Sequence, residues 1–232
     1  MRRTGNLQGS GLQDMANGLY RQACVQPSRQ KIHALSSSIL SVAVRTRVRR
    51  PGFMSHVFWL TGLPAAGKTT LARALEQRFK AQGQAVVVLD GDELRRGLCA
   101  DLGMSDADRQ ENIRRAGEVA ALLHRAGLQV ICAFVSPFAE DRLRVRRLFD
   151  TGRFTQVHVS TSLQVCMQRD PKGLYARAQR GELHNLTGWD APFEVPQDAE
   201  FVFDSHTMAT GPLLEALCER AYGAGRPHNP SA

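Results

Sequence analysis

The chain of 232 residues is long enough to fold as one α/β domain with a substantial core, and its 43% hydrophobic and 22% charged residues exclude wholesale disorder and a fibrous repeat. The net charge of +8 arises in residues 1–55, which hold nine basic side chains and one acidic side chain. The remaining residues carry 21 of each kind, so the charge of the folded body indicates no nucleic-acid partner.

Residues 1–55 are expected to form a basic, disordered leader, and residues 224–232 a flexible tail, on either side of a folded body at 56–223. The leader is rich in arginine and poor in acidic residues, a composition typical of organellar transit peptides. No cleavage site is recognisable in it, so we favour a dispensable extension, with Met54 as the working start. No apolar run reaches the roughly 18 residues that cross a membrane. We therefore expect no membrane association and a cytoplasmic protein, or an organellar one if the leader is a transit peptide.

The five cysteines are scattered along the chain, and none belongs to a C-x-x-C pair. This spacing argues against a disulfide framework or a zinc site and favours a reducing compartment. Cys132 lies within an apolar run, so we interpret it as a core residue rather than a nucleophile.

Strand and helix patterns alternate from residue 56 onward, which predicts a parallel sheet covered by helices. Strands are predicted at 57–61, 85–89, 128–134, 154–159 and 201–203. Helices are predicted at 68–82, 139–149, 162–169 and 212–222, and a long one to about residue 126 starts after Ser105, which forms a capping box with Asp108. The polar segment 171–196, interrupted by prolines and glycines, is expected to be mobile.

The clearest motif lies between the first strand and the first helix and matches G-x-x-x-x-G-K-[ST]; it reads Gly62-Leu63-Pro64-Ala65-Ala66-Gly67-Lys68-Thr69. The backbone N–H groups of such a loop, with the N-terminus of the following helix, bind nucleotide phosphates. Lys68 would contact the β- and γ-phosphates, and the hydroxyl group of Thr69 would ligate Mg²⁺. A chance match in a glycine-rich turn is disfavoured by the strand and helix around it. The motif predicts ATP binding without identifying the phosphate acceptor.

Polar residues follow the second and third strands, at the edge where parallel sheets bind ligands. Asp90 and Asp92 could orient metal-bound water or accept a hydroxyl proton, and Arg95 could bind an anionic acceptor. Alternatively, the acidic side chains only cap a turn. Ser136 would face the phosphates, although a serine before a proline is more often a simple strand terminator. The third strand ends without an acidic residue, so a metal ion would depend on Thr69, water and the two carboxylates.

Arg109 and Asn112 are three residues apart and share one face of the long predicted helix. Together with Arg95 they suggest an acceptor that carries its own anion. The alternative is a solvated helix face, which we expect for Arg114 and Arg115.

Together these segments resemble the adenylylsulfate kinases (APS kinases), which phosphorylate the 3′-hydroxyl group of adenosine 5′-phosphosulfate (APS). The resemblance extends over about residues 56–205 and rests on the phosphate loop and on the strings Leu89-Asp-Gly-Asp92, Asp108-Arg-Gln-Glu-Asn-Ile-Arg-Arg115, Ala133-Phe-Val-Ser-Pro137, Arg169-Asp-Pro-Lys-Gly-Leu-Tyr175 and Pro192-Phe-Glu194. It implies an α/β fold of the P-loop kinase type, with a parallel sheet flanked by helices in three layers (α/β/α) and a mobile lid at about 171–196.

The resemblance also implies roles for individual residues. It places ATP with Mg²⁺ at residues Gly62 to Thr70, with Thr69 and, through water, Asp90 near the metal ion. Catalytic roles fall to Lys68, Asp92 and Ser136. The family's serine at this last position is described as a phosphoserine intermediate, but we favour direct in-line transfer because no neighbouring base is evident. APS binding is implied for Asp92, Arg95, Met104, Arg109, Asn112, Val135, Ser136, Lys172, Asn185 and Leu186.

Two positions depart from the family pattern. Met104 and Leu186 stand where the family usually has phenylalanine, and the ring at the second position stacks on the adenine of the acceptor. Leucine packs on a purine without a π-face, which is a loss of about 1–3 kcal/mol if nothing compensates. We hypothesise that Trp189, three residues further on, supplies the missing ring.

The family is commonly dimeric, so we expect a homodimer whose partners are the small molecules ATP and APS, and no nucleic acid. Two other functions stay open at this stage. The same fold could phosphorylate another small molecule or nucleotide, or the chain could be a non-enzymatic ATP-binding regulator. The first alternative shares the phosphate loop but does not explain the Arg109 and Asn112 pair or the string around Lys172.

Overall fold

The computed structural model describes residues 54–223, and the expectations for the leader and the tail lie outside this range. Its centre is a five-stranded sheet in the order β2-β3-β1-β4-β5, and every neighbouring pair is parallel. The strands are β1 (Val57–Thr61), β2 (Val86–Asp90), β3 (Gln129–Ala133), β4 (Phe154–Val159) and β5 (Phe201–Phe203). The predicted parallel sheet is therefore confirmed, because all five strands were expected and their bounds differ from the prediction by at most a residue at either end.

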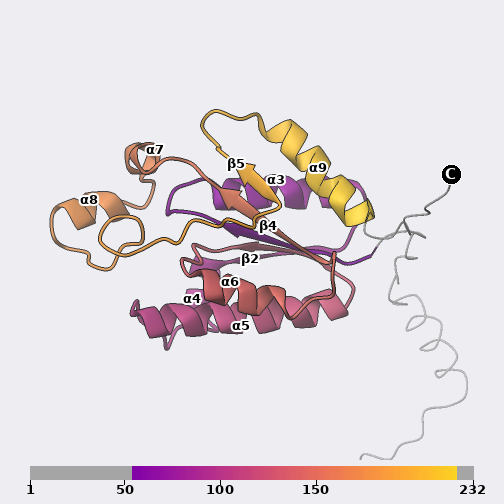
Figure 1. The fold of residues 1–232 in the computed structure, drawn as a ribbon, viewed down its shortest axis with the longest axis horizontal. Helices are drawn as coiled ribbons and strands as arrows, with labels where there is room; N and C mark the ends of the chain where they lie inside the picture. The colour runs from indigo at the N-terminus through magenta and orange to yellow at the C-terminus, as the bar shows by residue number, and fades with distance from the viewer. Residues whose placement is uncertain (1–53, 224–232) are drawn as a thin grey trace, which may run out of the picture. The chain divides into compact units, whose positions relative to one another are not determined.

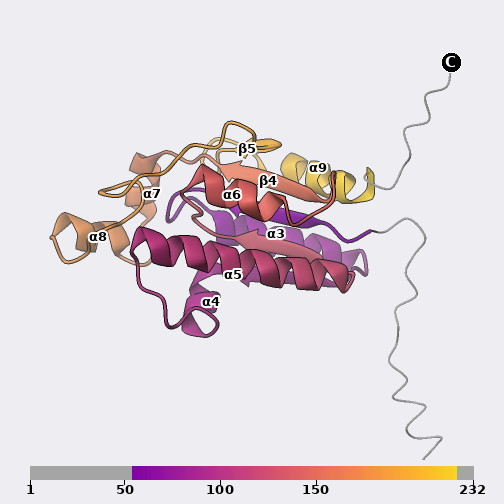
Figure 2. The same ribbon diagram turned by 60° about the horizontal axis from the view of Figure 1, so that its bottom comes forward.

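Helices cover both faces of this sheet, which confirms the three-layer α/β/α arrangement (Figure 1). Helices α3 and α9 lie on one face, and α4, α5 and α6 lie on the other. Helices α7 and α8 lie together beyond one end of the sheet in both ribbon views (Figures 1 and 2). The helices are α3 (Lys68–Ala81), α4 (Gly91–Arg96), α5 (Asp106–Arg125), α6 (Ala139–Arg146), α7 (Leu163–Arg169), α8 (Leu174–Gln179) and α9 (Thr210–Gly223).

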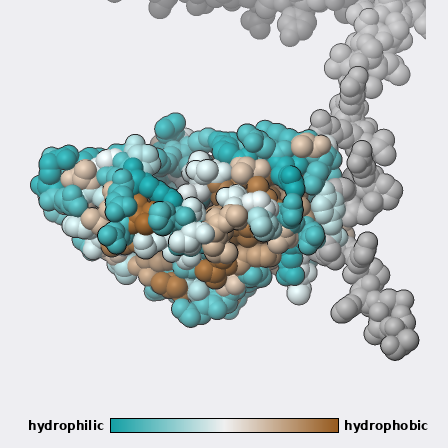
Figure 3. Space-filling view, turned by 90° about the horizontal axis from the view of Figure 1, so that it is seen from above, coloured by the Kyte–Doolittle hydropathy of each residue, from teal (hydrophilic) through white to brown (hydrophobic). Residues whose placement is uncertain are grey.

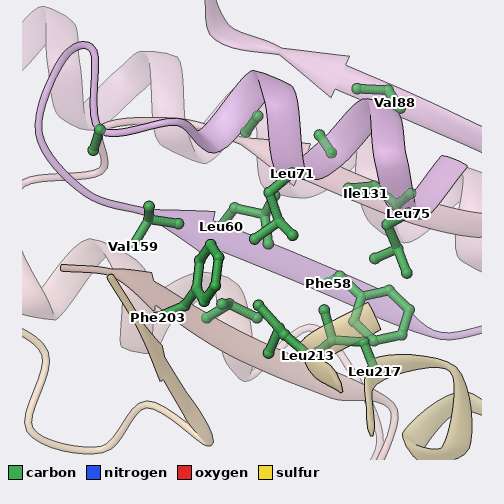
Figure 4. Close-up of a cluster of buried hydrophobic side chains, with 14 of the residues drawn as sticks. Phe58, Leu60, Leu71, Leu75, Val88, Ile131, Val159, Phe203, Leu213 and Leu217 are labelled. Atoms are coloured by element: carbon green, nitrogen blue, oxygen red, sulfur yellow. The ribbon is translucent and has the colours of Figure 1, made fainter. Parts of the chain in front are cut away.

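The central strand β1 shows why the sheet needs helices on both sides. All five of its residues are buried, and successive side chains point to opposite faces. Phe58 and Leu60 pack with residues of α3 and α9 in one core cluster (Figure 4), while Val57 and Trp59 pack with residues of α5 and α6 in the other. A continuous apolar strand of this kind is stable only when both of its faces are covered.

Two helices were not predicted. Helix α4 follows Asp90 directly, and α8 lies inside the segment 171–196, where only a polar, mobile stretch was expected. Each has six residues, too few to show a hydrophobic period. The segment also carries buried apolar side chains, among them Tyr175 and Leu186, which pack onto the main core cluster. The mobility of this segment, called the lid segment below, stays a prediction.

The helix termini follow local sequence signals where such signals exist. The capping box predicted before α5 is present, with the Ser105 hydroxyl accepting from the Asp108 amide and the Asp108 carboxylate accepting from the Ser105 amide. Helix α6 ends at Arg146, three residues before the predicted end. Among the described residues no helix combines the length and hydropathy that a membrane span requires. Seen from above, hydrophobic residues gather in the middle of the face and hydrophilic residues border it (Figure 3).

Candidate active site

A cleft of about 1150 Å³ lies where the loops that follow β1, β2 and β3 meet the lid segment. Most of the residues that the sequence singled out line it together, although they come from distant parts of the chain. The predicted residues in its lining are Pro64, Ala65, Gly67, Lys68, Thr69, Thr70, Asp90, Asp92, Arg95, Met104, Arg109, Asn112, Val135, Ser136, Lys172, Asn185 and Leu186. Gly62, Leu63 and Ala66 belong to the phosphate loop but do not line the cleft.

The phosphate loop, residues 62–69, needs both of its glycines. Gly62 and Gly67 have φ angles of 152° and 105°, which residues other than glycine rarely adopt. A Cβ atom on Gly62 would lie 2.4 Å from the carbonyl oxygen of Val159, and one on Gly67 would lie 2.9 Å from the hydroxyl oxygen of Ser205. The loop therefore runs close against β4 and the segment after β5, and it leads into the N-terminus of α3 at Lys68.

Lys68 is buried, with 9% of its surface exposed. Its Nζ atom donates hydrogen bonds to the carbonyl oxygens of Gly62 at 2.9 Å and Leu63 at 2.7 Å. Burial disfavours the charged form and lowers the pKa of Lys68 to about 8, against the attraction of nearby Asp90. An ammonium group held beneath a loop of amides is suited to neutralise phosphate oxygens.

Thr69 and Asp90 bring two oxygen ligands together at the end of β2. The Thr69 hydroxyl donates to Oδ2 of Asp90 at 2.8 Å, and Oδ1 of Asp90 accepts from the Asp92 amide at 3.0 Å as the N-cap of α4. The capping alternative for this segment is thus correct for Asp90 and compatible with a place in the cleft. Within residues 54–223 no group of three His, Cys, Asp or Glu side chains could hold a metal ion. A hydroxyl and one carboxylate fit Mg²⁺, which takes few protein ligands and completes its shell with water and substrate phosphates.

Asp92 forms an ion pair with Lys172 of the lid segment, and both side chains are about half exposed. Arg95 donates from Nη1 to the Gly103 carbonyl at 2.8 Å. The lid segment also meets the phosphate loop, because Oη of Tyr175 donates to the carbonyl of Pro64 at 3.2 Å. The lid segment therefore contacts both the phosphate loop and the residues that follow β2.

Arg109 and Asn112 are buried in the cleft, with 7% and 5% of their surfaces exposed, so a solvated helix face is wrong for this pair. Arg109 donates to the carbonyl oxygen of Asn185 and to the hydroxyl of Thr187 at 2.5 Å, both in the lid segment. Its Nε also donates to the carbonyl of Met104 at 3.1 Å. The side-chain oxygen of Asn112 is buried and has no hydrogen-bond partner among the described residues.

The neighbouring arginines behave as the solvated alternative predicts. Arg114 and Arg115 form ion pairs with Glu111, and Arg115 also pairs with Asp101 at 2.6 Å. Neither arginine lines the cleft.

Ser136 has a φ of 47°, in the left-handed region that residues with a side chain rarely occupy. It is buried, and its hydroxyl oxygen accepts from Nε1 of Trp59 at 3.3 Å. In the described part of the chain no carboxylate or imidazole hydrogen-bonds to this hydroxyl. The residue is more than a strand terminator, since its conformation is unusual and it lines the cleft.

Three side chains that the sequence did not single out hold the phosphate loop from behind. The carbonyl oxygen of Ala66 accepts from the hydroxyls of Thr161 at 3.0 Å and Ser205 at 2.7 Å, and from Arg169 at 3.5 Å. Arg169 also donates to the Ser205 hydroxyl at 2.7 Å. Arg169 stands in one of the family strings, and Ser205 follows the last predicted strand, but their contact with Ala66 has no signature in the sequence.

The positions that depart from the family pattern separate in the structure. Leu186 is buried and Met104 is half exposed, and both line the cleft. Trp189 is 43% exposed and is absent from the lining. This conformation gives no support to the hypothesis that Trp189 replaces the missing ring.

A parallel sheet with a glycine-rich phosphate loop after β1 and a buried lysine at the start of α3 defines a P-loop nucleotide-binding protein. The family model described as adenylylsulphate kinase matches residues 54–204. The chain belongs to this family, and it is an enzyme that transfers a phosphoryl group to a hydroxyl group of APS.

Similar proteins of known sequence and structure agree with this assignment. The adenylyl-sulfate kinase of Shewanella sp. (strain MR-4) is 52% identical over 179 residues, which are 77% of this chain and 87% of that protein. The adenylyl-sulfate kinase of Escherichia coli O139:H28 is 47% identical over 176 residues, 76% and 88% of the two chains. A solved structure of the Mycobacterium tuberculosis APS kinase in complex with AMPPNP and APS has a TM-score of 0.68 and 38% identity, and covers 72% of this chain and 97% of that one.

Proposed function

We propose that the enzyme transfers the γ-phosphoryl group of ATP to the 3′-hydroxyl group of APS, giving ADP and 3′-phosphoadenosine 5′-phosphosulfate. The observation that carries this proposal is the composition of one cleft. It joins the phosphate loop to a second group of polar residues, Asp92, Arg95, Arg109 and Asn112, that the phosphate loop alone does not require. A second anion-binding region beside the triphosphate fits an acceptor that is itself a charged nucleotide.

On the ATP side, the loop amides and Lys68 bind the phosphates and stabilise the charge that develops on the transferred group. Thr69 and Asp90 would hold Mg²⁺, which neutralises phosphate charge when bound. Thr161, Arg169 and Ser205 keep the loop in shape through the Ala66 carbonyl. These residues bind and orient ATP without forming a covalent bond to it.

On the acceptor side, Arg95, Arg109 and Asn112 bind the phosphosulfate nucleotide, and Asp92 accepts or relays the proton of the 3′-hydroxyl group. The side-chain oxygen of Asn112, which has no partner within residues 54–223, supports this placement, because a buried acceptor is suited to an N–H or O–H group of the nucleotide. Direct in-line transfer is favoured over a phosphoserine at Ser136, since within residues 54–223 the only side-chain partner of its hydroxyl is the donor Trp59, which cannot remove a proton.

Two side chains that we propose to bind APS, Asp92 and Arg109, are bonded to the lid segment in this structure. Lys172 pairs with Asp92, and Arg109 binds backbone and side chain at Asn185 and Thr187. We infer that APS exchanges these contacts for its own when it binds, and that Lys172, Asn185 and Leu186 then close over it. The part of the cleft proposed to hold APS, called the acceptor region below, also includes Val135 and Ser136.

A coupled ADP-release assay with APS as the sole acceptor tests this function, and AMP, gluconate and shikimate in parallel test the other kinase activities. We expect ADP release with APS alone among the four. Lys68→Ala should abolish turnover. Asp92→Asn should reduce kcat at least about 100-fold while KM for ATP changes little, because a base acts on the transition state and not on ATP binding. Normal rates in either variant would contradict the roles assigned to these residues.

The cellular setting is part of the same proposal. We propose that the enzyme is cytoplasmic and forms a homodimer. The cytoplasmic location is supported by the cysteines of the described residues, which are free and buried as expected in a reducing compartment: Cys99, Cys132, Cys166 and Cys218. The relatives from Shewanella and Escherichia coli described above are bacterial. The matching APS kinase of Thiobacillus denitrificans is described as hexameric, and this chain covers 30% of its length. Sedimentation of the purified chain would distinguish a dimer from a larger assembly.

A further inference from the structure

Arg142 on α6 is almost fully buried, with 2% of its surface exposed, yet it forms no ion pair within 4 Å in the described residues. Its guanidinium group instead binds two backbone carbonyl oxygens from distant segments. Nη1 donates to Ser136 at 2.7 Å, and Nη2 donates to Glu194 at 2.7 Å. The fork of the guanidinium group thus joins the end of β3 to the downstream end of the lid segment.

Glu194 makes the same connection from the other side. Its amide donates to the carbonyl oxygen of Pro137 at 2.9 Å, and its carboxylate accepts from the amide of Ala139 at 2.5 Å. Ala139 is the first residue of α6, whose N-cap residue provides no side-chain hydrogen bond, so the carboxylate caps this helix from a remote position. Glu194 belongs to the string Pro192-Phe-Glu194, to which the proposed mechanism gives no role.

These bonds converge on a strained part of the acceptor region. Ser136 holds its left-handed φ of 47° between Arg142, which binds its carbonyl, and Trp59, which binds its hydroxyl. Thr61 at the end of β1 adds a hydrogen bond to the carbonyl of Val135 at 2.7 Å. A rare backbone conformation persists only where its surroundings determine it from several sides.

We propose that Arg142 and Glu194 are positioning residues for APS: they hold residues Val135 and Ser136 in the conformation that receives the acceptor and fix the downstream end of the lid segment to it. This inference rests on the proposed function, in which Val135 and Ser136 line the acceptor region. Neither Arg142 nor Glu194 lines the cleft, so both act through the residues that they hold.

The clamp formed by Arg142 and Glu194 differs from the other ties between the lid segment and the body. The pair of Lys172 with Asp92 and the bonds of Arg109 use side chains that APS itself would bind, so substrate must break them. The clamp uses the backbone carbonyl of Ser136 and no side chain proposed to bind APS. The lid segment therefore opens from its upstream and middle parts, while its end at residues 192–195 stays in place.

Steady-state kinetics on the full chain, with ATP and APS varied separately, tests the clamp. In Arg142→Lys the new side chain cannot reach both carbonyl oxygens, and in Glu194→Ala the carboxylate that caps α6 is lost. Each variant should raise KM for APS about tenfold or more and leave KM for ATP within about twofold. Glu194→Gln should restore most of the wild-type KM for APS, because its amide oxygen can accept from the same N–H group. Matched controls on α6, Arg144→Lys and Glu140→Gln, should leave both constants unchanged, because both side chains are exposed.

Equal changes in both KM values, unchanged KM values with only a lower melting temperature, or a Glu194→Gln variant as impaired as Glu194→Ala would overturn the proposal. Hydrogen–deuterium exchange on the wild-type chain tests it without any variant. The amides of Ala139 and Glu194, which donate within the clamp, should be equally protected with and without APS, while protection at 172–190 changes. Rapid exchange of the Glu194 amide in the free enzyme would refute the fixed end. Loss of APS-dependent ADP release from the wild-type chain would instead refute the proposed function itself.

Discussion

Above about pH 8, nucleotide binding should become weaker and should be accompanied by proton uptake, because Lys68 of the free enzyme loses its charge near this pH. Burial holds the pKa of Lys68 at about 8 instead of 10.5, a difference of about 3 kcal/mol in favour of the neutral amine. The triphosphate adds negative charge beside this group and favours the ammonium form. Free enzyme is thus protonated at Lys68 below pH 8 and neutral above it, whereas the complex stays protonated to higher pH.

The size of the effect follows from these two pKa values. If bound phosphates restore the ordinary pKa, binding should take up about 0.1 proton at pH 7 and about 0.8 proton at pH 8.5. The affinity should be almost constant below pH 8 and should fall above it, approaching tenfold for each pH unit, until the pKa of the complex is reached. The sign is fixed by linkage: the state that binds more protons is favoured at low pH.

Isothermal titration calorimetry with AMPPNP, in two buffers of different ionisation enthalpy at each pH, measures the proton uptake directly. Lys68→Arg keeps a permanent charge and should bind with no uptake at pH 8.5. Lys80→Gln changes an exposed lysine on the same helix and should leave the uptake unchanged. A wild-type uptake near zero at pH 8.5, or one that survives in Lys68→Arg, would refute the assignment of the titrating group.

Three further substitutions test other parts of the cleft. Ser205→Ala removes one hydrogen bond to the Ala66 carbonyl, worth about 1 kcal/mol, and should raise KM for ATP about fivefold. Ser205→Thr keeps the hydroxyl and should stay close to wild type. An unchanged KM for ATP in Ser205→Ala would show that Thr161 and Arg169 hold the loop without Ser205. Leu186→Phe places a ring in the cleft lining and should lower KM for APS about tenfold if the ring stacks on adenine; no change would argue against stacking there. Trp189→Ala should leave KM for APS unchanged, because Trp189 lies outside the lining, and a clear rise would restore its hypothesised role.

Much of the fold could be predicted because its signals are local. Apolar runs bounded by turns predicted β1, β4 and β5, and the capping box of Ser105 predicted the start of α5. The phosphate loop carries its own pattern, and it lies between a strand and a helix as that pattern requires. The short helices α4 and α8 were missed, since six residues are too few to establish a period.

The supporting contacts of the site could not be predicted, because their partners are far apart in the sequence. Thr161 and Ser205 lie 95 and 139 residues from the Ala66 carbonyl that they hold. Arg109 was expected in the cleft from its spacing with Asn112, but nothing local indicated that it also binds the lid segment 76 and 78 residues away. Residues that touch ligands leave motifs, whereas residues that hold a backbone carbonyl can be of several types.

The strand order also has an evolutionary consequence. β1 stands in the middle of the sheet, with β4 and β5 on one side and β3 and β2 on the other. The supports of the phosphate loop, Thr161 and Ser205, follow β4 and β5, whereas Asp92 and Ser136 follow β2 and β3. The lid segment, with the proposed APS residues Lys172 and Leu186, lies between β4 and β5, whereas Asp90, proposed to hold the metal ion of ATP, ends β2. If these roles hold, residues for each substrate come from both sides of β1, so adapting the cleft to a new alcohol would require coordinated changes on both sides of the sheet.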